Sequence, residues 1–530
     1  MSYLRIVTGP TVPFLALRAD VFARALDARD ARFDGVFFVG ITTTRVYCRP
    51  VCPARVAYRD HRRFFRSAAA AERAGFRPCM RCRPELAPGC APIDAVPRLA
   101  RAAAHRIAAG ALNGRTVADL ARDLGVGERH LRRALEHEIG VSPLGLAQTH
   151  RLLLAKQLLA DTGLAVTRVA YASGFQSLRR FNAAFREQYR MTPSAVRRAP
   201  RARGVEKAPL AEDDAPLRLS LAYRAPFAWD ALLAFLRCDA IDGVEIVDGR
   251  RYARTIHVEG RSGFVIVEDA ALQTDGWRAD VRLRAPAPIA RRRANTQASH
   301  VNVAVSPSLV PALMPLLARL RQLFDLDAEP TVIDAHLAQG GLGALVARRP
   351  GVRIPGAIDG FDVALRALLR GRARAGRGMS SRDPARRVAW ALGEPLETGI
   401  PALSRLAPTA ARVADAGSAR LKALGIPRRR ANAAVAVARL VADGTLRLEP
   451  GSDVTATRRA LTEITGVGDQ VATTIVMRAL YWPDAFSVTD RALQRAAEVS
   501  TPRELRARGE RWRPWRAYAA LHLWLEDEAH

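Results

Sequence analysis

The spacing of apolar and polar residues changes along the chain and divides it into segments. Between residues 94 and 199, apolar residues recur every three or four positions, which predicts amphipathic helices with outward-facing arginines. Between 217 and 330, short runs alternate, which predicts an antiparallel sheet with a covering helix over 311–324. Residues 200–216 are rich in proline, alanine and both charge signs, and predict a linker. The predicted strands are 217–221, 252–258, 264–267 and 301–305.

Two parts of the helical segment have the spacing of a helix-turn-helix. In the first, Thr116 and Asp119 predict a capping box at the start of a helix, and Gly125 predicts the turn. The second unit begins at Thr167 and turns at Gly174, and Ser177 is the predicted N-cap of its second helix. A long amphipathic helix, at about 144–160, joins the two units. Two units on one rigid helix suit successive major grooves, roughly 34 Å apart on one face of a duplex.

The outward residues that follow each turn are candidate DNA contacts. For any single arginine, a phosphate contact or a solvated helix face is a simpler interpretation than base readout. We therefore assign DNA binding to the helices and not to individual base pairings. The candidates are Arg129, His130, Arg132 and Arg133 in the first unit, and Ser177, Arg179, Arg180 and Asn182 in the second.

The charge balance indicates a polyanionic partner. The 530 residues include 82 basic and 52 acidic side chains, a formal net charge of +30, and only three of the basic residues are lysine. The length suggests roughly three to five domains. No apolar run approaches the ~18 residues of a membrane helix. Residues 1–20 are interpreted as an N-terminal extension without an export signal, so we expect a bacterial cytoplasmic protein.

Four of the six cysteines lie close together in the sequence. They form a C-x3-C pair and a C-x2-C pair, and in a reducing compartment two such pairs predict a tetrahedral zinc site. On spacing alone, a purely structural zinc knuckle is the simpler interpretation. Cys90 and Cys238 have no partner at a useful spacing. The predicted ligands are Cys48, Cys52, Cys79 and Cys82.

The residues around these cysteines resemble the N-terminal zinc domain of the Ada family of methylation-response proteins. The resemblance covers about residues 20–88 and is carried by 37–55 and 74–82. It implies a zinc-bound α/β domain, assigned to 21–90. In that family the first cysteine of the C-x3-C pair accepts a methyl group from a DNA methylphosphotriester. The acceptor here is Cys48, with Arg45 and Arg49 as expected contacts to the DNA backbone.

The helical segment that follows resembles the DNA-binding domain of AraC-type activators. The match covers about 95 residues and includes Phe181–Glu187 and Met191–Pro193. The resemblance implies two helix-turn-helix units over 94–199, in agreement with the periodicity.

The sequence from Leu461 to Gln470 predicts a helix-hairpin-helix. Its glycines, Gly466 and Gly468, allow backbone amides to approach a DNA phosphate closely. Together with Asp490 and the tryptophan-rich stretch near the C-terminus, this motif resembles the AlkA group of helix-hairpin-helix DNA glycosylases. The resemblance covers about 217–530. It also includes residues 323–326, 348–356 and 421–427.

The AlkA resemblance implies an antiparallel α+β domain over 217–330 and an all-α glycosylase domain over 331–530. By that likeness Asp490 is the catalytic carboxylate, and Trp524 lies in the base pocket. Gln470 stands where the group usually has tryptophan, so we expect weaker or altered base selection. The other aromatic residues of this region are expected in the core: Tyr481, Trp482, Trp512, Trp515 and Tyr518.

The scarcity of lysine narrows the expected chemistry. Superfamily members that also nick the strand carry a lysine two residues after the last glycine of the hairpin. That position is Gln470 here, and the only lysine of this half is Lys422. Because a protonated arginine does not readily form an imine, we expect a glycosylase without lyase activity and without a cofactor.

One segment departs from the AlkA pattern. Where the group has a helix close to the residue that wedges into DNA, residues 370–387 contain seven arginines, and 371–378 contain three glycines. Such glycine content disfavours a helix. Two explanations stay open: a divergent basic loop, or a short out-of-frame stretch of the gene.

The combined expectation is a multidomain, mainly α protein with smaller α+β parts that binds double-stranded DNA as a monomer. It would act as a methylation-responsive activator, with RNA polymerase as protein partner, and would excise alkylated bases of the 3-methyladenine type. The alternative is a damage-sensing transcription factor whose glycosylase half only binds DNA.

Overall fold

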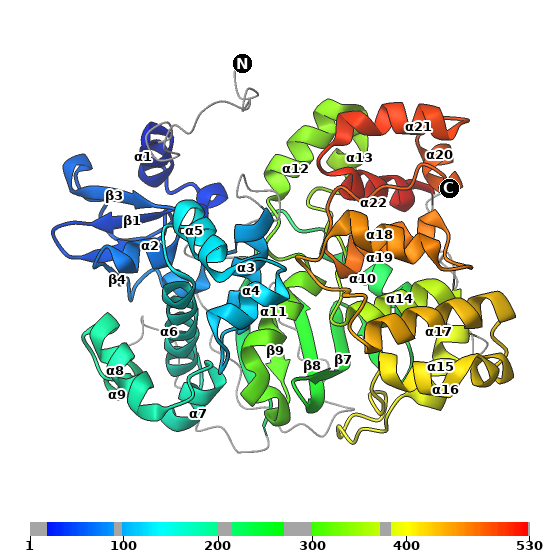
Figure 1. Ribbon diagram of the computed structural model, residues 1–530. Coiled ribbons are helices and arrows are strands. Elements are labelled where there is room, and N and C mark those ends of the chain that lie inside the picture. The colour runs from blue at the N-terminus through cyan, green and yellow to red at the C-terminus, as the bar shows by residue number, and fades with distance from the viewer. Residues whose placement is uncertain (1–18, 90–97, 199–214, 270–298, 371–382, 528–530) are drawn as a thin grey trace.

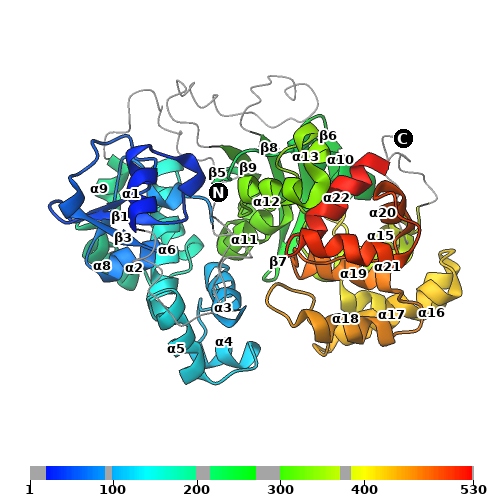
Figure 2. The same ribbon diagram turned by 90° about the horizontal axis from the view of Figure 1, so that it is seen from above.

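The computed structural model describes residues 19–89, 98–198, 215–269, 299–370 and 383–527. It is a mainly helical, multidomain protein with two small sheets, which confirms the expected class (Figure 1). In both views the N-terminal elements lie on one side and the C-terminal helices on the other (Figure 2). The predictions for residues 1–18, Cys90, the linker up to 214 and the arginine-rich stretch at 371–382 lie outside the described residues.

A four-stranded sheet in the order β3-β1-β2-β4 forms the N-terminal domain. β1 pairs antiparallel with β2 and β3, whereas β2 pairs in parallel with β4. Gly40 is required in β1, because a Cβ there would lie 2.8 Å from the Phe65 and Phe76 rings. The elements are α1 (Ala19–Asp27), η1 (Ala31–Phe33), β1 (Phe38–Ile41), β2 (Val46–Cys48), η2 (Arg59–His61), β3 (Arg62–Phe65), α2 (Ala68–Arg73), β4 (Arg77–Pro78) and η3 (Pro84–Leu86).

Seven helices follow and contain both predicted helix-turn-helix units. The capping box is confirmed: Thr116 Oγ1 accepts from Asp119 N at 3.1 Å, and Asp119 Oδ2 accepts from Thr116 N at 3.0 Å. Gly125 and Gly174 make the turns with φ of +68° and +89°. The helices are α3 (Arg98–Ala108), α4 (Val117–Asp123), α5 (Glu128–Glu138), α6 (Pro143–Asp161), α7 (Val166–Ala172), α8 (Leu178–Tyr189) and α9 (Pro193–Arg198).

The second sheet is antiparallel and has the order β5-β9-β8-β7-β6. All four predicted strands are confirmed, but the sequence reasoning missed β6 and α10. The predicted covering helix exists and begins as a 3₁₀ segment. The elements are β5 (Leu217–Ala222), α10 (Trp229–Asp239), β6 (Glu245–Asp248), β7 (Arg251–Val258), β8 (Arg261–Asp269), β9 (His300–Val305), η5 (Pro307–Ala312) and α11 (Leu313–Leu323).

The described C-terminal part consists of helices joined by loops, with isolated β-bridges but no strand of a sheet. Its helices pack around two apolar cores, one centred on α14, α17 and α19 and the other on α12 and α22. They are α12 (Pro330–Leu337), η6 (Ala338–Leu342), α13 (Gly343–Arg348), α14 (Gly360–Arg370), α15 (Pro384–Leu392), α16 (Ala410–Ala423), α17 (Arg428–Ala442), α18 (Val454–Glu463), α19 (Asp469–Ala479), α20 (Arg491–Ala496), α21 (Pro502–Gly509), η7 (Glu510–Trp512) and α22 (Arg516–Asp527). In the described part of the chain, no helix is both long and apolar enough to cross a membrane.

The helix α6 joins the zinc domain to the second sheet as well as the two helix-turn-helix units. Lys156 Nζ is buried, lies 2.7 Å from Glu85 Oε2 and donates to Cys79 O at 3.2 Å. The next residue, Gln157, donates to Ser220 O of β5 at 3.1 Å. The apolar core of the second helix-turn-helix unit is also continuous with that of the sheet. The modules are therefore packed together through buried contacts.

A buried carboxylate connects the end of α11 to the C-terminal helices. Asp325 is completely buried and accepts hydrogen bonds from Tyr481 Oη, from Tyr518 Oη at 2.8 Å and from Ile354 N at 3.2 Å. Burial raises the pKa of Asp325 to about 6, although these donors and Arg353 oppose the shift. The native protein therefore holds this proton in a pH range where the unfolded chain has released it.

We expect Asp325→Asn to remove a pH-dependent part of the stability. Because the pKa is raised on folding, the native state keeps a proton between about pH 4 and pH 6 that the unfolded chain has released. The unfolding free energy of the wild type should therefore fall by about 3 kcal/mol as the pH rises across that window. The variant should not show this loss. Denaturant unfolding of both proteins from pH 4 to pH 7 measures the difference. If the unfolding free energies of the two proteins changed with pH in the same way, the raised pKa of Asp325 would be contradicted.

Candidate functional sites

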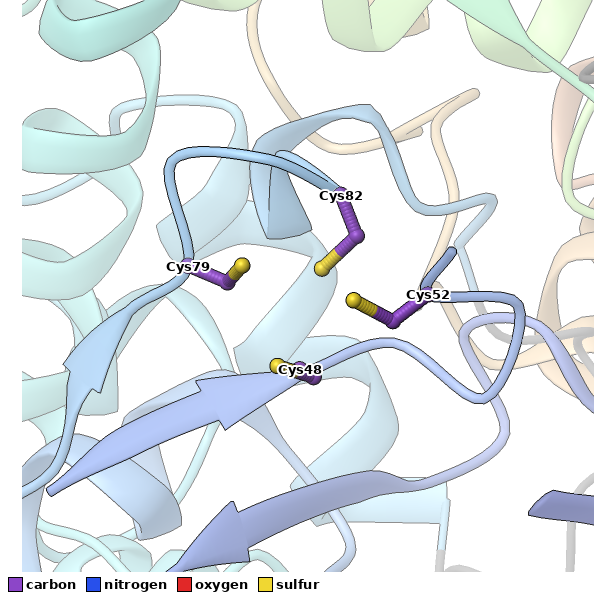
Figure 3. Close-up of side chains that lie close together, drawn as sticks. All are labelled: Cys48, Cys52, Cys79 and Cys82. Carbon is purple, nitrogen blue, oxygen red and sulfur yellow. The ribbon is translucent and has the colours of Figure 1, made fainter. Parts of the chain in front are cut away.

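The predicted zinc ligands come together at one end of the first sheet (Figure 3). Cys48 ends β2, and the parallel pairing of Tyr47 with Pro78 brings Cys79, which follows β4, beside it. Cys52 and Cys82 follow in the adjoining loops. All four side chains are buried, and their Sγ atoms lie within 4.8 Å of one another. This pairing explains why two cysteine pairs far apart in the sequence form one cluster.

The chemistry of the cluster fits a divalent cation. The neighbouring Cys52, Cys79 and Cys82 thiols, together with burial, raise the pKa of the Cys48 thiol. Four buried thiols at this separation therefore need a cation in order to ionise together, and tetrahedral zinc is the usual one. The four cysteines accordingly form the zinc site of this domain.

The four sulfur atoms differ in their hydrogen bonds. Arg49 N donates to Cys82 Sγ and Arg81 N donates to Cys79 Sγ, each at 3.3 Å. A backbone hydrogen bond from Ala54 also contributes to lowering the pKa of the Cys52 thiol. Among the described residues, no backbone N–H reaches Cys48 Sγ. Since an N–H bond withdraws electron density from a thiolate, Cys48 keeps the most available lone pair.

The two arginines expected to contact DNA here lie in different environments. Arg45 is exposed, with its guanidinium 5.7 Å from the centre of the Phe76 ring. Arg49 is buried: Nε donates to Asp34 Oδ1 at 2.8 Å, and Nη1 donates to Cys82 O at 3.1 Å. The expected backbone contact of Arg49 does not fit this position. The Arg49 side chain instead bonds to Asp34 and to the Cys82 carbonyl inside the domain.

The helix-turn-helix candidates are mostly at the surface. On α5, Arg132 is half-buried and its Nε donates to Glu128 at 3.0 Å, whereas its predicted neighbours are exposed. On α8, Ser177 is the N-cap and accepts from Arg180 N at 3.5 Å, so its hydroxyl has a structural role. The exposed candidates are Arg129, His130, Arg133, Arg179 and Arg180, and Asn182 is half-buried.

The predicted helix-hairpin-helix is formed by α18, a tight turn and α19. Gly466 has φ of +105°, and a Cβ there would lie 3.0 Å from Arg429 O, so both backbone conformation and space require glycine. Gly468 is the exposed N-cap of α19, and nothing lies within 4 Å of the place where its Cβ would be. The hairpin therefore offers uncovered backbone and the positive end of a helix dipole.

The predicted catalytic carboxylate, Asp490, is completely buried. It is the N-cap of α20, where Oδ1 accepts from Ala492 N at 2.8 Å and from Leu493 N at 3.4 Å. Oδ2 accepts from Gln470 Nε2 at 2.7 Å and from Trp524 Nε1 at 3.2 Å. The structure thus brings together all three residues that the sequence assigned to catalysis and the base pocket.

These residues line an open cavity of about 850 Å³ between the second sheet domain and the C-terminal helices. Helices α10, α14, α19, α20 and α22 contribute to its wall. Phe235 of α10 was missed by sequence reasoning, because α10 itself was not predicted. Its ring is 5.1 Å from the Arg478 guanidinium, which also lies 2.6 Å from Asp239.

The remaining aromatic residues support the walls of this region. Trp512 and Tyr518 are at most 1% exposed, as expected for core residues. Trp482 and Trp515 are partly buried against the same core, and Tyr481 donates to Asp325. This leaves Trp524 and Phe235 as the aromatic side chains that line the cavity.

Comparisons with known proteins cover all three parts of the chain. The metal binding domain of Ada matches residues 22–85, a helix-turn-helix domain matches 120–199 and the AlkA N-terminal domain matches 218–359. A probable bifunctional transcriptional activator/DNA repair enzyme AlkA of Mycobacterium tuberculosis is 35% identical over 506 residues, covering 94% of this chain and 95% of the relative.

Two further relatives each match one half. DNA-3-methyladenine glycosylase 2 of Escherichia coli is 32% identical over 312 residues, covering 58% of this chain and 97% of that protein. The bifunctional transcriptional activator/DNA repair enzyme Ada of Escherichia coli is 33% identical over 149 residues, covering 28% and 40%.

The fold and the two sites define a DNA-binding protein that combines a zinc-thiolate domain, a double helix-turn-helix and a glycosylase fold. The chain belongs to the family of AlkA-type bifunctional transcriptional activator and DNA repair proteins.

We expect Cys82→Ala to abolish stoichiometric zinc binding and to make residues 19–89 sensitive to protease, because metal affinity contributes to the folding free energy of so small a domain. Metal analysis should give one zinc per wild-type chain. The Cys238→Ala variant, which removes a thiol from the other half, should keep it. Equal zinc content in both variants would contradict the four-cysteine site.

Proposed function

We propose that this protein is a methylation-responsive transcriptional activator that also removes alkylated bases from DNA. The proposal is carried by one observation: a buried four-thiol cluster and a buried, fully hydrogen-bonded carboxylate beside a cavity occur in a single chain. The domain boundaries inferred from the sequence, 21–90, 94–199, 217–330 and 331–530, assign methyl sensing to the first domain and base excision to the last two.

Methyl transfer would use Cys48 as the nucleophile. When zinc is bound, it keeps the thiolates deprotonated at neutral pH. The Cys48 sulfur attacks the methyl carbon of a DNA methylphosphotriester, a C–S bond forms, and the methyl C–O bond breaks. The phosphodiester leaves with the electron pair. The hydrogen bonds at Cys79 and Cys82, and their absence at Cys48 among the described residues, support this choice.

The transfer would raise DNA affinity by changing the charge of the site. Four thiolates on a divalent cation carry −2, and conversion of one to a thioether leaves −1. Repulsion of DNA phosphates falls accordingly, and the exposed Arg45 and Arg81 engage the backbone more strongly. Arg49 does not take part in this contact, since it is paired with Asp34 in the domain interior.

After incubation with DNA that contains methylphosphotriesters, we expect peptide mass spectrometry to place one methyl group on Cys48. The Cys238→Ala variant should be methylated to the same extent, because Cys238 lies outside the cluster. A methyl group on Cys52, Cys79 or Cys82, or no methyl group, would contradict the assignment.

Base excision would use the cavity beside Asp490. Alkylation at a ring nitrogen makes a base cationic and a good leaving group, and the base must be flipped out of the stack to be reached. Trp524 offers an aromatic face to the base. The Asp490 carboxylate stabilises the positive charge that develops on the sugar as the glycosidic bond breaks, and guides the water that adds there.

The reaction would end at an abasic site. The residue after Asp469, where strand-nicking relatives carry lysine, is Gln470, and its amide donates to Asp490. Lys422 lies at the end of α16 and does not line the cavity. Among the described residues, no lysine amine lines the cavity where it could attack the sugar carbon.

We expect the wild type to release 3-methyladenine from alkylated DNA and Asp490→Asn to lower the single-turnover rate by about 100-fold or more, the scale on which loss of a charge-stabilising group acts. The products should be the free base and an uncut strand, with no adduct trapped by borohydride. Absence of release by the wild type would support the alternative, in which this half only binds DNA. A borohydride adduct would overturn the monofunctional assignment.

We also propose a monomer that works in the bacterial cytoplasm at the nucleoid, with RNA polymerase as its protein partner. The charge of +30 and the exposed arginines of α5 and α8 support the choice of DNA as the site of action.

A further inference from the structure

The Asp490 carboxylate is held by donors that divide between its two oxygens. Oδ1 receives the two amides at the start of α20, so that oxygen is tied to the backbone. Oδ2 receives two side chains, Gln470 and Trp524, which both line the cavity. The Gln470 contact, at 2.7 Å, is the shorter. The oxygen whose side-chain partners line the cavity is therefore oriented mainly by this amide.

The hydrogen bond also fixes which way the Gln470 amide points. Gln470 Nε2 donates to Asp490 Oδ2 at 2.7 Å, so the carbonyl oxygen Oε1 of the same amide points away from the carboxyl group. Within the described part of the chain no donor reaches Oε1. Gln470 is also on the wall of the cavity. The cavity thus presents a hydrogen-bond acceptor where an aromatic side chain would present only a face.

The cavity wall also carries two aromatic side chains, Phe235 and Trp524. Phe235 already has the Arg478 guanidinium 5.1 Å from its ring centre, and that guanidinium is paired with Asp239. Trp524 is the remaining aromatic residue, and its indole N–H is used by Asp490. This bond lies in the plane of the indole, so the face of the Trp524 ring stays available for stacking. Stacking does not distinguish the edges of different bases, so selection among bases depends on hydrogen bonding to the edge.

We propose that Gln470 acts at this site in two ways: Nε2 positions the Asp490 carboxylate, and Oε1 accepts a hydrogen bond from the flipped base. The cavity then favours lesions that carry an N–H donor on the edge facing α19, whether or not the base is cationic. This inference rests on the proposed glycosylase activity.

The positioning role is tested with Gln470→Leu, which keeps most of the volume and removes both polar atoms. Single-turnover release of 3-methyladenine should slow by about 10- to 100-fold, the effect of losing one hydrogen bond to a charged group. In the Asp490→Asn background the same change should slow release much less, because Nε2 acts through the carboxylate. An equal fold-loss in both backgrounds would overturn the positioning role, since a packing defect alone would slow both proteins alike.

The acceptor role is tested with two neutral lesions in the same duplex. Hypoxanthine carries a ring N–H, whereas ethenoadenine has no N–H donor on the corresponding edge. The wild type should release hypoxanthine faster, and Gln470→Leu should bring the ratio close to one. An unchanged ratio, or release of neither lesion by a wild type that releases 3-methyladenine, would overturn the acceptor role.

Two controls separate this inference from the proposed function. Gln339→Leu makes the same substitution at an exposed residue of the glycosylase half, and should match the wild type in its rate of base release. If the wild type released no base at all, the proposed glycosylase activity would fail, and this inference with it. If base release depends on Asp490 but is indifferent to Gln470, only this inference fails.

Discussion

Removing a carboxylate from water is costly unless its oxygens are hydrogen-bonded, and the C-terminal half is arranged around one such group. Asp490 caps α20, accepts from Gln470 on the first turn of α19 and accepts from Trp524 near the end of α22. One side chain thus ties three helices together at the wall of the cavity. The contacts that satisfy the buried carboxyl group also fix its orientation at the cavity wall.

The zinc cluster connects the elements of the N-terminal domain in a similar way. Its ligands come from two strand ends brought together by parallel pairing, and the surrounding sheet is too small to form a large core. Arg49 supports the cluster from inside, through Asp34 on one side and the Cys82 carbonyl on the other. Lys156 then connects the cluster to α6 through Glu85 and Cys79 O. These contacts place the cluster next to the helix that joins the two helix-turn-helix units.

Much of this organisation could be predicted from the sequence because it depends on local signals. Capping residues, turn glycines such as Gly125 and cysteine spacing act over a few residues, and they located both helix-turn-helix units and the zinc ligands. The helix α10 was missed although Trp229, Leu232, Leu233 and Leu236 have helical spacing, and strand β6 was missed because it has only four residues. The burial of Arg49 and the bond between Gln470 and Asp490 join residues distant in sequence, which no local pattern encodes.

The proposed protein is both a methyl acceptor and a base-excising enzyme in one chain. In the most direct measurement, DNA is treated with a methylating agent and a single preparation of the protein is added. The protein and the released bases are then analysed from the same sample. The account predicts that the protein gains the mass of one methyl group while free 3-methyladenine appears in solution. An unmodified protein together with no free base would contradict it.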